Sequence, residues 1–138
     1  MNQEDSVGFQ ISKTTNKFRK ITTELLTKYN IAPEQRTILE IIKNNYNIDQ
    51  TTLAVIVQKD KTTISRTINT LIKKNFVIKK SSKKDRRLNL LYLTKEALIV
   101  LKKSDYIIKS LREKTDSIIT LDEKKELFQI LNKLNQEL

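Results

Sequence analysis

A short polar segment, residues 61–74, carries the side chains best suited to recognise another molecule. Thr62, Arg66 and Asn69 follow one another at steps of four and three residues, so in a helix they share one face. Arg, Asn and Thr can reach base edges in the major groove of DNA. The opposite face is apolar: Ile64, Ile68, Leu71 and Ile72. We therefore predict an amphipathic helix with a candidate DNA-reading face, although a merely solvated polar face would show the same pattern.

The residues at the two ends of this segment favour the same helix. Asp60 directly precedes it and is a candidate N-cap, because its carboxylate can accept hydrogen bonds from the first free backbone amides. Lys73 and Lys74 lie in the last turn, where positive charge is stabilised by the helix dipole.

Two apolar segments that flank a polar loop follow the predicted helix. Residues 76–78 read Phe-Val-Ile, residues 88–94 read Leu-Asn-Leu-Leu-Tyr-Leu-Thr, and residues 79–87 between them are Lys, Ser, Asp and Arg. This pattern predicts a β-hairpin. Because the loop contains no Gly, we expect a longer tip rather than a tight two-residue turn.

Positive charge is concentrated on this helix and hairpin. Residues 59–87 hold eleven Lys and Arg and two Asp, a net charge of +9. The rest of the chain holds sixteen Lys and Arg and fourteen Asp and Glu, a net charge of only +2. A polyanion is therefore the expected partner of this region.

Three short segments of this region resemble a known family. Asp85-Arg86-Arg87, followed by Leu93-Thr94, resembles the Asp-x-Arg wing signature of the MarR family (multiple antibiotic resistance regulators). Upstream, Leu53-Ala54 and Asp60-Lys61-Thr62-Thr63-Ile64-Ser65-Arg66 resemble two further segments of that family. The similarity continues at lower strength from about residue 18 to the C-terminus.

The resemblance implies a fold and a function. The fold would be mainly α, of the α+β class: a winged helix-turn-helix with a two-stranded β-wing and long N- and C-terminal dimerisation helices. The protein would be a homodimer that binds double-stranded DNA and regulates transcription, with repression as our interpretation. Residues 61–74 would be the recognition helix. Arg87 would enter the minor groove, held by an ion pair with Asp85.

The residue pattern and the resemblance together give one set of candidate DNA-binding residues. Side chains of the recognition helix would read bases, and basic side chains at its start and on the wing would contact phosphates. The set is Lys59, Lys61, Thr62, Thr63, Ser65, Arg66, Asn69, Lys83, Lys84, Asp85, Arg86 and Arg87.

The chain departs from the family pattern at two positions. Asn75 stands where the family usually has Gly after the recognition helix, and Asn tolerates the left-handed conformation found there. Ala97 stands where the family usually has Gly after Thr-x-x, and we expect it to let a helix begin directly after Thr94.

Helical periodicity covers most of the remaining chain. We expect helices over 7–28, over 33–44 with Pro33 in its first turn, and from an N-cap at Asp49 to residue 57. Residues 58–59 would form the turn of the helix-turn-helix. The expected organisation is a single domain, 1–138, with a DNA-binding unit over 33–94 and dimerisation helices over 7–30 and 95–138.

After Thr94 apolar residues recur at nearly heptad spacing and predict a helix of more than 20 residues, a break near Thr120 and a final helix. The apolar positions are Leu98, Leu101, Ile108, Leu111 and Ile118, then Leu127, Leu131, Leu134 and Leu138. So small a winged helix cannot cover these stripes and that of residues 7–28. A second copy of the chain is the expected partner, with packing inside a monomeric bundle as the alternative.

Composition argues against an enzyme. The chain has no Cys, no His and one Gly, which removes the thiol nucleophile, the commonest general base, the common zinc ligands and phosphate-binding glycine loops. Asp122, Glu123 and Glu126 cluster, but at the start of the last helix, where acids suit the dipole better than a metal. We therefore expect neither metal nor cofactor. No apolar run approaches membrane-spanning length, so we expect a cytoplasmic protein without a membrane partner.

Two questions stay open at this stage. A basic structural or RNA-binding module, which grips phosphates without reading bases, is the alternative to a DNA reader. It ranks second because such proteins usually stack bases on aromatic rings, and the basic stretch offers only Phe76, which we expect to be buried. The resemblance also implies a small-molecule effector, aromatic or anionic. The sequence identifies neither its pocket nor the operator, the target genes or the sign of regulation.

Overall fold

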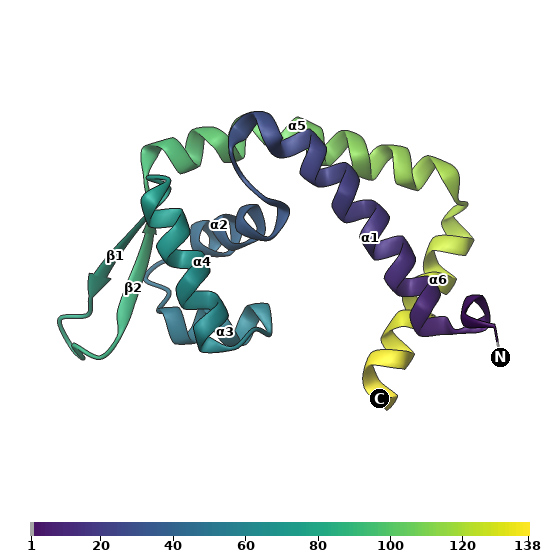
Figure 1. Ribbon diagram of the computed structural model, residues 1–138, viewed down its shortest axis with the longest axis horizontal. Helices are drawn as coiled ribbons and strands as arrows, with labels where there is room; N and C mark the ends of the chain where they lie inside the picture. Colours follow the sequence, from purple (N-terminus) through teal and green to yellow (C-terminus); the bar gives the residue numbers. More distant parts are fainter. Residues whose placement is uncertain (1) are drawn as a thin grey trace. The chain divides into compact units, whose positions relative to one another are not determined.

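The computed structural model describes residues 2–138, which form six α-helices, two short 3-10 helices and one β-hairpin. This confirms the mainly α class with a two-stranded antiparallel wing. In chain order the elements are a 3-10 helix Gln3–Asp5, α1 Val7–Leu26, a 3-10 helix Thr27–Tyr29, α2 Pro33–Asn44, α3 Gln50–Val57, α4 Lys61–Lys73, β1 Val77–Ser81, β2 Asn89–Leu93, α5 Lys95–Ile118 and α6 Leu121–Glu137 (Figure 1).

The chain forms two compact units, and the boundary between them falls inside α5. The first unit extends through Ser104 and holds the hairpin, α1 to α4 and the first turns of α5. The second, Asp105–Leu138, holds the rest of α5 and α6. None of the helices in residues 2–138 is both long enough and apolar enough to cross a membrane.

Helix ends follow the predicted caps closely. Asp49 accepts a hydrogen bond from the Thr52 amide at 2.7 Å and caps α3, and Asp60 caps α4 in the same way. In the second unit Thr120 and Glu123 exchange side-chain to backbone hydrogen bonds of 2.8 and 3.1 Å, so acids do begin the last helix. Residues 2–138 contain no acidic cluster able to hold a metal ion.

Among residues 2–138, four residues other than Gly take the left-handed backbone conformation: Asn30, Asn47, Gln58 and Asn75. Asn75 has φ 64° just after α4, as expected for a residue that replaces Gly there. Gln58 has φ 58° in the turn between α3 and α4, where Gly is the more usual residue. This turn was expected, but its conformation at a Gln was not.

The core of the first unit brings α2, α3, α4, the hairpin and the start of α5 together. Its best-buried side chains are fully covered: Leu26, Leu39, Leu53, Ile68, Leu71 and Ala97 are 0% exposed. Ile64, Ile68 and Leu71 of α4 lie in this core, which confirms the apolar face predicted from spacing. The opposite face of α4 is therefore fixed toward solvent.

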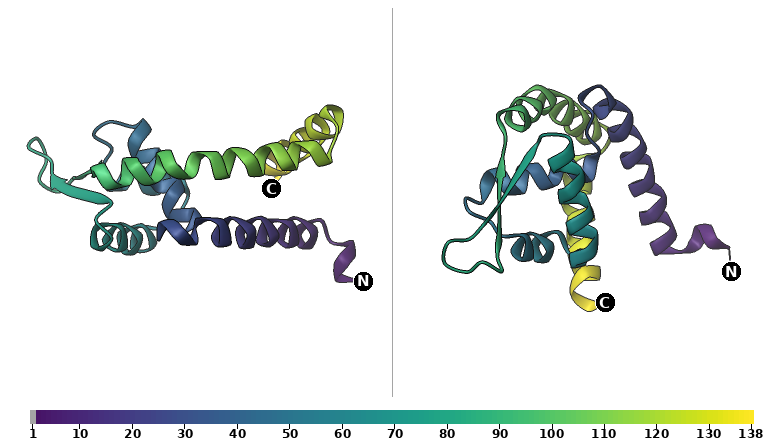
Figure 2. Two further views of the ribbon diagram at one scale, coloured as in Figure 1. Left: turned by 90° about the horizontal axis from the view of Figure 1, so that it is seen from above. Right: turned by 60° about the vertical axis from the view of Figure 1, so that its left-hand side comes forward.

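The hairpin has one face toward this core and one face away from it. Val77 and Leu91 lie in the core, whereas Ile78, which follows Val77, and Lys80, which follows the Lys79 paired with Leu91, are exposed. The register pairs Ile78 with Tyr92 and Lys80 with Leu90 on the outer face. β1 runs to Ser81, further than the predicted Phe76–Ile78 run, because its lysines continue the backbone pairing with β2 (Figure 2).

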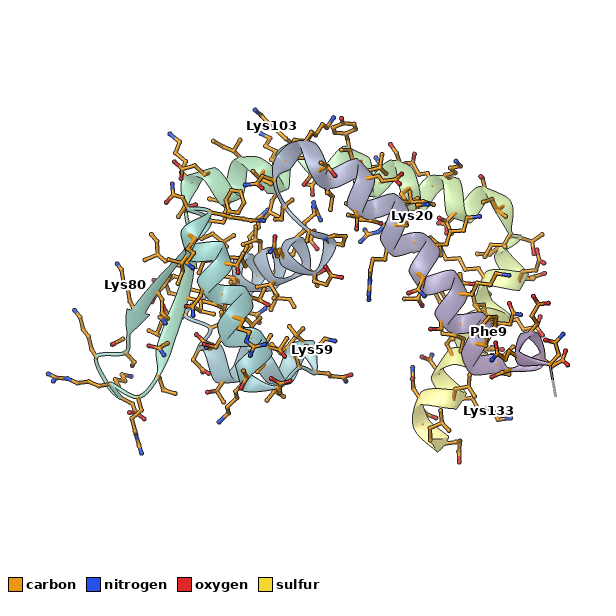
Figure 3. All side chains as sticks on the ribbon, in the orientation of Figure 1. Phe9, Lys20, Lys59, Lys80, Lys103 and Lys133 are labelled. Carbon is orange, nitrogen blue, oxygen red and sulfur yellow. The ribbon has the colours of Figure 1, made fainter. Side chains whose placement is uncertain are left out.

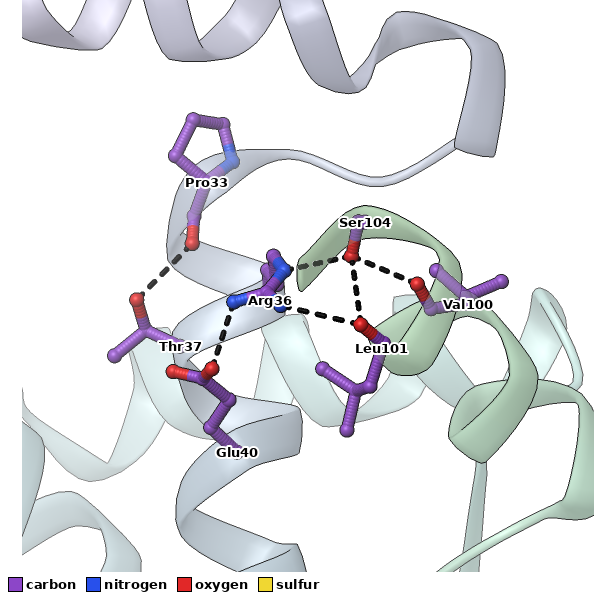
Figure 4. A network of polar contacts seen from close by, with 7 residues as sticks. All are labelled: Pro33, Arg36, Thr37, Glu40, Val100, Leu101 and Ser104. Atoms are coloured by element: carbon purple, nitrogen blue, oxygen red, sulfur yellow. Dashed lines mark hydrogen bonds and ion pairs between the residues drawn. The ribbon is translucent and has the colours of Figure 1, made fainter. Parts of the chain in front are cut away.

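A buried arginine joins α2 to α5. Arg36 is 4% exposed, and its Nη1 lies 2.7 Å from the Glu40 carboxylate. Its Nε donates to the Ser104 hydroxyl at 2.8 Å and its Nη2 to the Leu101 carbonyl at 3.3 Å (Figure 4). The sequence analysis assigned no role to Arg36, because its partners on α5 lie more than 60 residues away.

We expect Ser104→Ala to destabilise the protein by about 1–3 kcal/mol, because it removes the acceptor of a buried guanidinium hydrogen bond. Urea denaturation would measure the change in the free energy of unfolding. The matched control is Ser117→Ala in an exposed turn of the same helix, expected to change stability by less than about 0.5 kcal/mol. Equal losses in the two variants would contradict a structural role for the Arg36 cluster.

Candidate nucleic-acid interface

Helix α4 presents an exposed polar face opposite the core. Thr62, Arg66 and Asn69 are all exposed on it, as are Thr70 and Lys73. Lys61 opens the helix and is also exposed, whereas Ser65 is half-buried. A helix carrying Arg, Asn and Thr on a face free of apolar side chains has the donors and acceptors needed to read base edges.

Thr63 is engaged within the helix cap. Its amide donates to Asp60 Oδ1 at 2.7 Å and its hydroxyl donates to Asp60 Oδ2 at 2.9 Å. These hydrogen bonds, the backbone one foremost, lower the pKa of Asp60 and keep its carboxylate ionised. The Thr63 hydroxyl is thus already engaged with the N-cap residue of α4.

At the wing, Asp85 and Arg87 form the expected ion pair. Arg87 Nε lies 3.2 Å and its backbone amide 3.0 Å from Asp85 Oδ1. Both residues lie in a turn closed by a hydrogen bond from the Leu88 amide to the Asp85 carbonyl, not in an extended strand. The pairing arises because the Asp side chain accepts the amide two residues on, which brings the Arg87 side chain beside it.

This pairing fixes a very exposed guanidinium. The Arg87 side chain is 90% exposed and that of Asp85 37%. The side-chain hydrogen bond from Arg87, followed by the one from its backbone amide, lowers the pKa of Asp85. Asp85 therefore stays charged at neutral pH and holds Arg87 outward from the hairpin tip.

The wing and the start of α4 meet around one small recess. Its volume is about 90 Å³, and Lys61 and Arg87 both line it. The other lining residues are Gln50, Thr51 and Asn89. The sequence analysis missed these three, whose polar types gave no signal at the start of α3 and β2. The two sets of predicted residues, on the helix and on the wing, are thus brought to one region of the surface.

The remaining predicted lysines and arginine are exposed. Lys59 lies in the turn before α4 (Figure 3). Lys83, Lys84 and Arg86 lie in the loop between β1 and β2. Lys74 is different, because its Nζ donates to the Asn30 carbonyl at 3.0 Å and to Gln35 Oε1 at 2.9 Å. Part of the local charge therefore fastens α4 to the rest of the unit and does not face outward.

Comparison with known proteins agrees with this geometry. The MarR family matches residues 31–88, which cover the helix-turn-helix and most of the wing. A "Putative transcriptional regulatory protein for hcr operon" of Thauera aromatica is 30% identical over 77 residues, 56% of this chain. That match spans about half, 46%, of the length of the relative.

Solved structures share the fold along nearly the whole chain. The S. aureus MepR–DNA complex aligns with a TM-score of 0.92 at 16% identity and covers 96% of this chain and 98% of that one. PcaV from Streptomyces coelicolor, solved with its natural ligand, aligns with a TM-score of 0.88 at 18% identity and covers 99% and 96%. At these identities the likeness shows the fold.

The family match covers the elements that carry the exposed polar helix and the Asp85–Arg87 pair, and the likeness in fold to MepR covers 96% of the chain. The family matched over residues 31–88 and the fold are those of transcriptional regulators and not of enzymes. Residues 31–88 are thus a MarR-family segment, within a chain that has the winged-helix fold of MarR proteins.

Proposed function

We propose that this regulator binds double-stranded DNA sequence-specifically as a homodimer on a near-palindromic operator. The observation that carries the proposal is the convergence of the exposed face of α4 with Arg87 at one region of the surface. In the proposed complex Arg66 and Asn69 read bases in the major groove, and Arg87 enters the adjacent minor groove. The resemblance to the MepR–DNA complex in fold supports this docking.

The proposal divides the remaining candidate residues by task. Lys59, Lys61, Lys83, Lys84 and Arg86 are exposed and basic, so they would neutralise phosphates. Thr62 and Ser65 have short side chains, and their hydroxyls would hydrogen-bond to the sugar-phosphate backbone of the DNA. Thr63 and Asp85 would act indirectly, because each is bound to a neighbour whose position it fixes.

Exposed apolar side chains support the homodimer. Val7, Ile11, Phe18 and Leu25 form one stripe of α1 and are 40–60% exposed. On α6, Leu121, Leu127 and Phe128 are also exposed. Exposed apolar stripes of this kind usually mark interfaces, and we infer that a second copy of the chain covers them.

Regulation would act in the cytoplasm through occupancy of the operator. A dimer seated on an operator that overlaps a promoter would exclude polymerase, so we propose repression. A small aromatic or anionic effector would release the protein by favouring a dimer with a different spacing of its two α4 helices. PcaV, which shares the fold, has been solved with a natural ligand.

Arg66→Ala tests base reading. We expect it to weaken operator binding by roughly 1–3 kcal/mol and to relax the preference at one base position in each half-site. Lys59→Ala, a matched loss of one charge beside α4, should instead weaken all duplexes alike and reduce the slope of log K against log salt by about 0.9. Gel-shift titrations over a set of operator variants would compare the two. Equal, sequence-independent losses would remove α4 as the reading helix.

Asp85→Ala tests the wing. Deleting an acid raises the net charge and by itself favours binding to a polyanion, but a freed Arg87 would lose its fixed pose. We expect Asp85→Ala and Arg87→Ala each to weaken operator binding, and the double variant to be little weaker than Arg87→Ala. Thermal unfolding should change little, because an exposed ion pair contributes little stability. Tighter binding by Asp85→Ala would reduce the wing to a diffuse basic patch.

The dimer can be tested on the stripe of α1. Sedimentation should show a wild-type dimer at micromolar concentration, and Phe18→Asp should shift it toward monomer because a charge would enter the interface. Val55→Asp, at a 73% exposed apolar position on α3, is the control and should leave the dimer intact. The proposed operator then carries two half-sites about 34–36 Å apart. A wild-type monomer, or a footprint over a single half-site, would contradict the proposal.

A further inference from the structure

A second recess lies on the outer face of the hairpin, and no step of the proposed duplex reading uses it. Its volume is about 620 Å³, within the range of ligand pockets in general. Its lining includes two tyrosines, Tyr46 and Tyr92, and three lysines, Lys80, Lys83 and Lys84. Asn47 and smaller side chains complete it, and none of the described residues that line it is acidic. We call it the tyrosine recess.

The tyrosines are held in place by the loop after α2. The Tyr92 hydroxyl donates to Asn47 Oδ1 at 2.6 Å, and Asn47 itself has the left-handed φ of 59°. The Tyr46 and Tyr92 rings meet edge to face, with centroids 6.3 Å apart and planes at 65°. Tyr46 is nevertheless 87% exposed. The result is an aromatic ring that is positioned by its neighbours and open to solvent.

The lysines give the recess the character of a phosphate site. Lys80 Nζ lies 5.8 Å from the centre of the Tyr92 ring, and Lys83 and Lys84 are exposed on the hairpin tip. Open aromatic rings beside a basic groove are the features that bind unpaired nucleotides, because bases stack on the rings while cations track the phosphates. A duplex offers its bases only at groove edges and cannot use an exposed ring in this way.

The recess lies on the opposite side of the hairpin from the duplex-facing region. Leu90 lines the tyrosine recess, whereas its neighbour Asn89 lines the recess shared by Lys61 and Arg87. Successive residues of a strand point to opposite faces, so the two recesses face apart. Only the lysines of the tip are shared between the tyrosine recess and the proposed phosphate contacts.

We propose that the tyrosine recess binds single-stranded nucleic acid, with an unpaired base stacked on Tyr46 and its flanking phosphates held by Lys80, Lys83 and Lys84. This would be a second nucleic-acid activity of the chain, carried by residues that do not read the operator. It does not depend on the proposed operator binding, because neither Tyr46 nor Lys80 takes part in that function.

The test uses the full chain and a labelled single-stranded oligonucleotide of about 12 nucleotides, within the usual site sizes. Fluorescence anisotropy should show binding that Tyr46→Ala weakens about tenfold, whereas Tyr46→Phe keeps the ring and retains affinity. Because the chain has no Trp, quenching of tyrosine emission reports stacking directly, and Tyr46→Ala should lose part of that quenching. Lys80→Ala should lower the salt slope by about 0.7.

Operator binding provides the opposite control. Tyr46→Ala should bind the duplex as wild type does, and Arg66→Ala should lose the duplex while binding the single strand within about twofold of wild type. Weaker single-strand binding by Tyr46→Ala with unchanged duplex binding supports the proposal, whether or not Arg66→Ala weakens duplex binding. Unchanged single-strand affinity in Tyr46→Ala would overturn it. Binding of a free mononucleotide as tight as that of the oligonucleotide would also overturn it, by assigning the recess to a small molecule.

Discussion

The burial of one guanidinium, that of Arg36, sets the geometry of the first unit. A charged group taken out of water is costly unless its donors are satisfied, and here a carboxylate, a hydroxyl and a carbonyl from α2 and α5 do so. These bonds require the two helices to keep one separation and one register. The Leu91 amide of β2 also donates to the Ile48 carbonyl, in the loop between α2 and α3, so the wing is held against the same part of the unit. Arg36 thus links the start of α5 to the elements that carry the candidate interface.

Acidic residues within the basic region fix backbone geometry. The acidic residues of the segment 59–87 are Asp60 and Asp85, and each accepts hydrogen bonds from a residue two or three positions further along the chain. These bonds lower the pKa of both carboxylates, so both are ionised at physiological pH. One fixes the first turn of α4 and the other fixes Arg87.

The parts of this arrangement that are local in sequence could be predicted, and the parts that depend on distant contacts could not. Caps at Asp49 and Asp60, the apolar face of α4 and the left-handed Asn75 follow from neighbours within a few residues. The engagement of Lys74 with Asn30 and the burial of Arg36 against Ser104 depend on helices separated by tens of residues. The pairing of Arg87 with Asp85 was expected from the family resemblance, but the turn that creates it was not predicted.

The same limit explains why the sequence argued against an aromatic platform. Within the basic stretch the one aromatic residue is Phe76, which is 6% exposed and lies in the core. Folding brings Tyr46 from the loop after α2 and Tyr92 from β2 against the lysines of β1. In the two proposals one hairpin would have a duplex-facing side and an aromatic side that share the cations of a single tip. Since Lys83 and Lys84 can neutralise the phosphates of only one strand at a time, occupation of either side would then lower the affinity of the other, and the coupling would be equal in both directions.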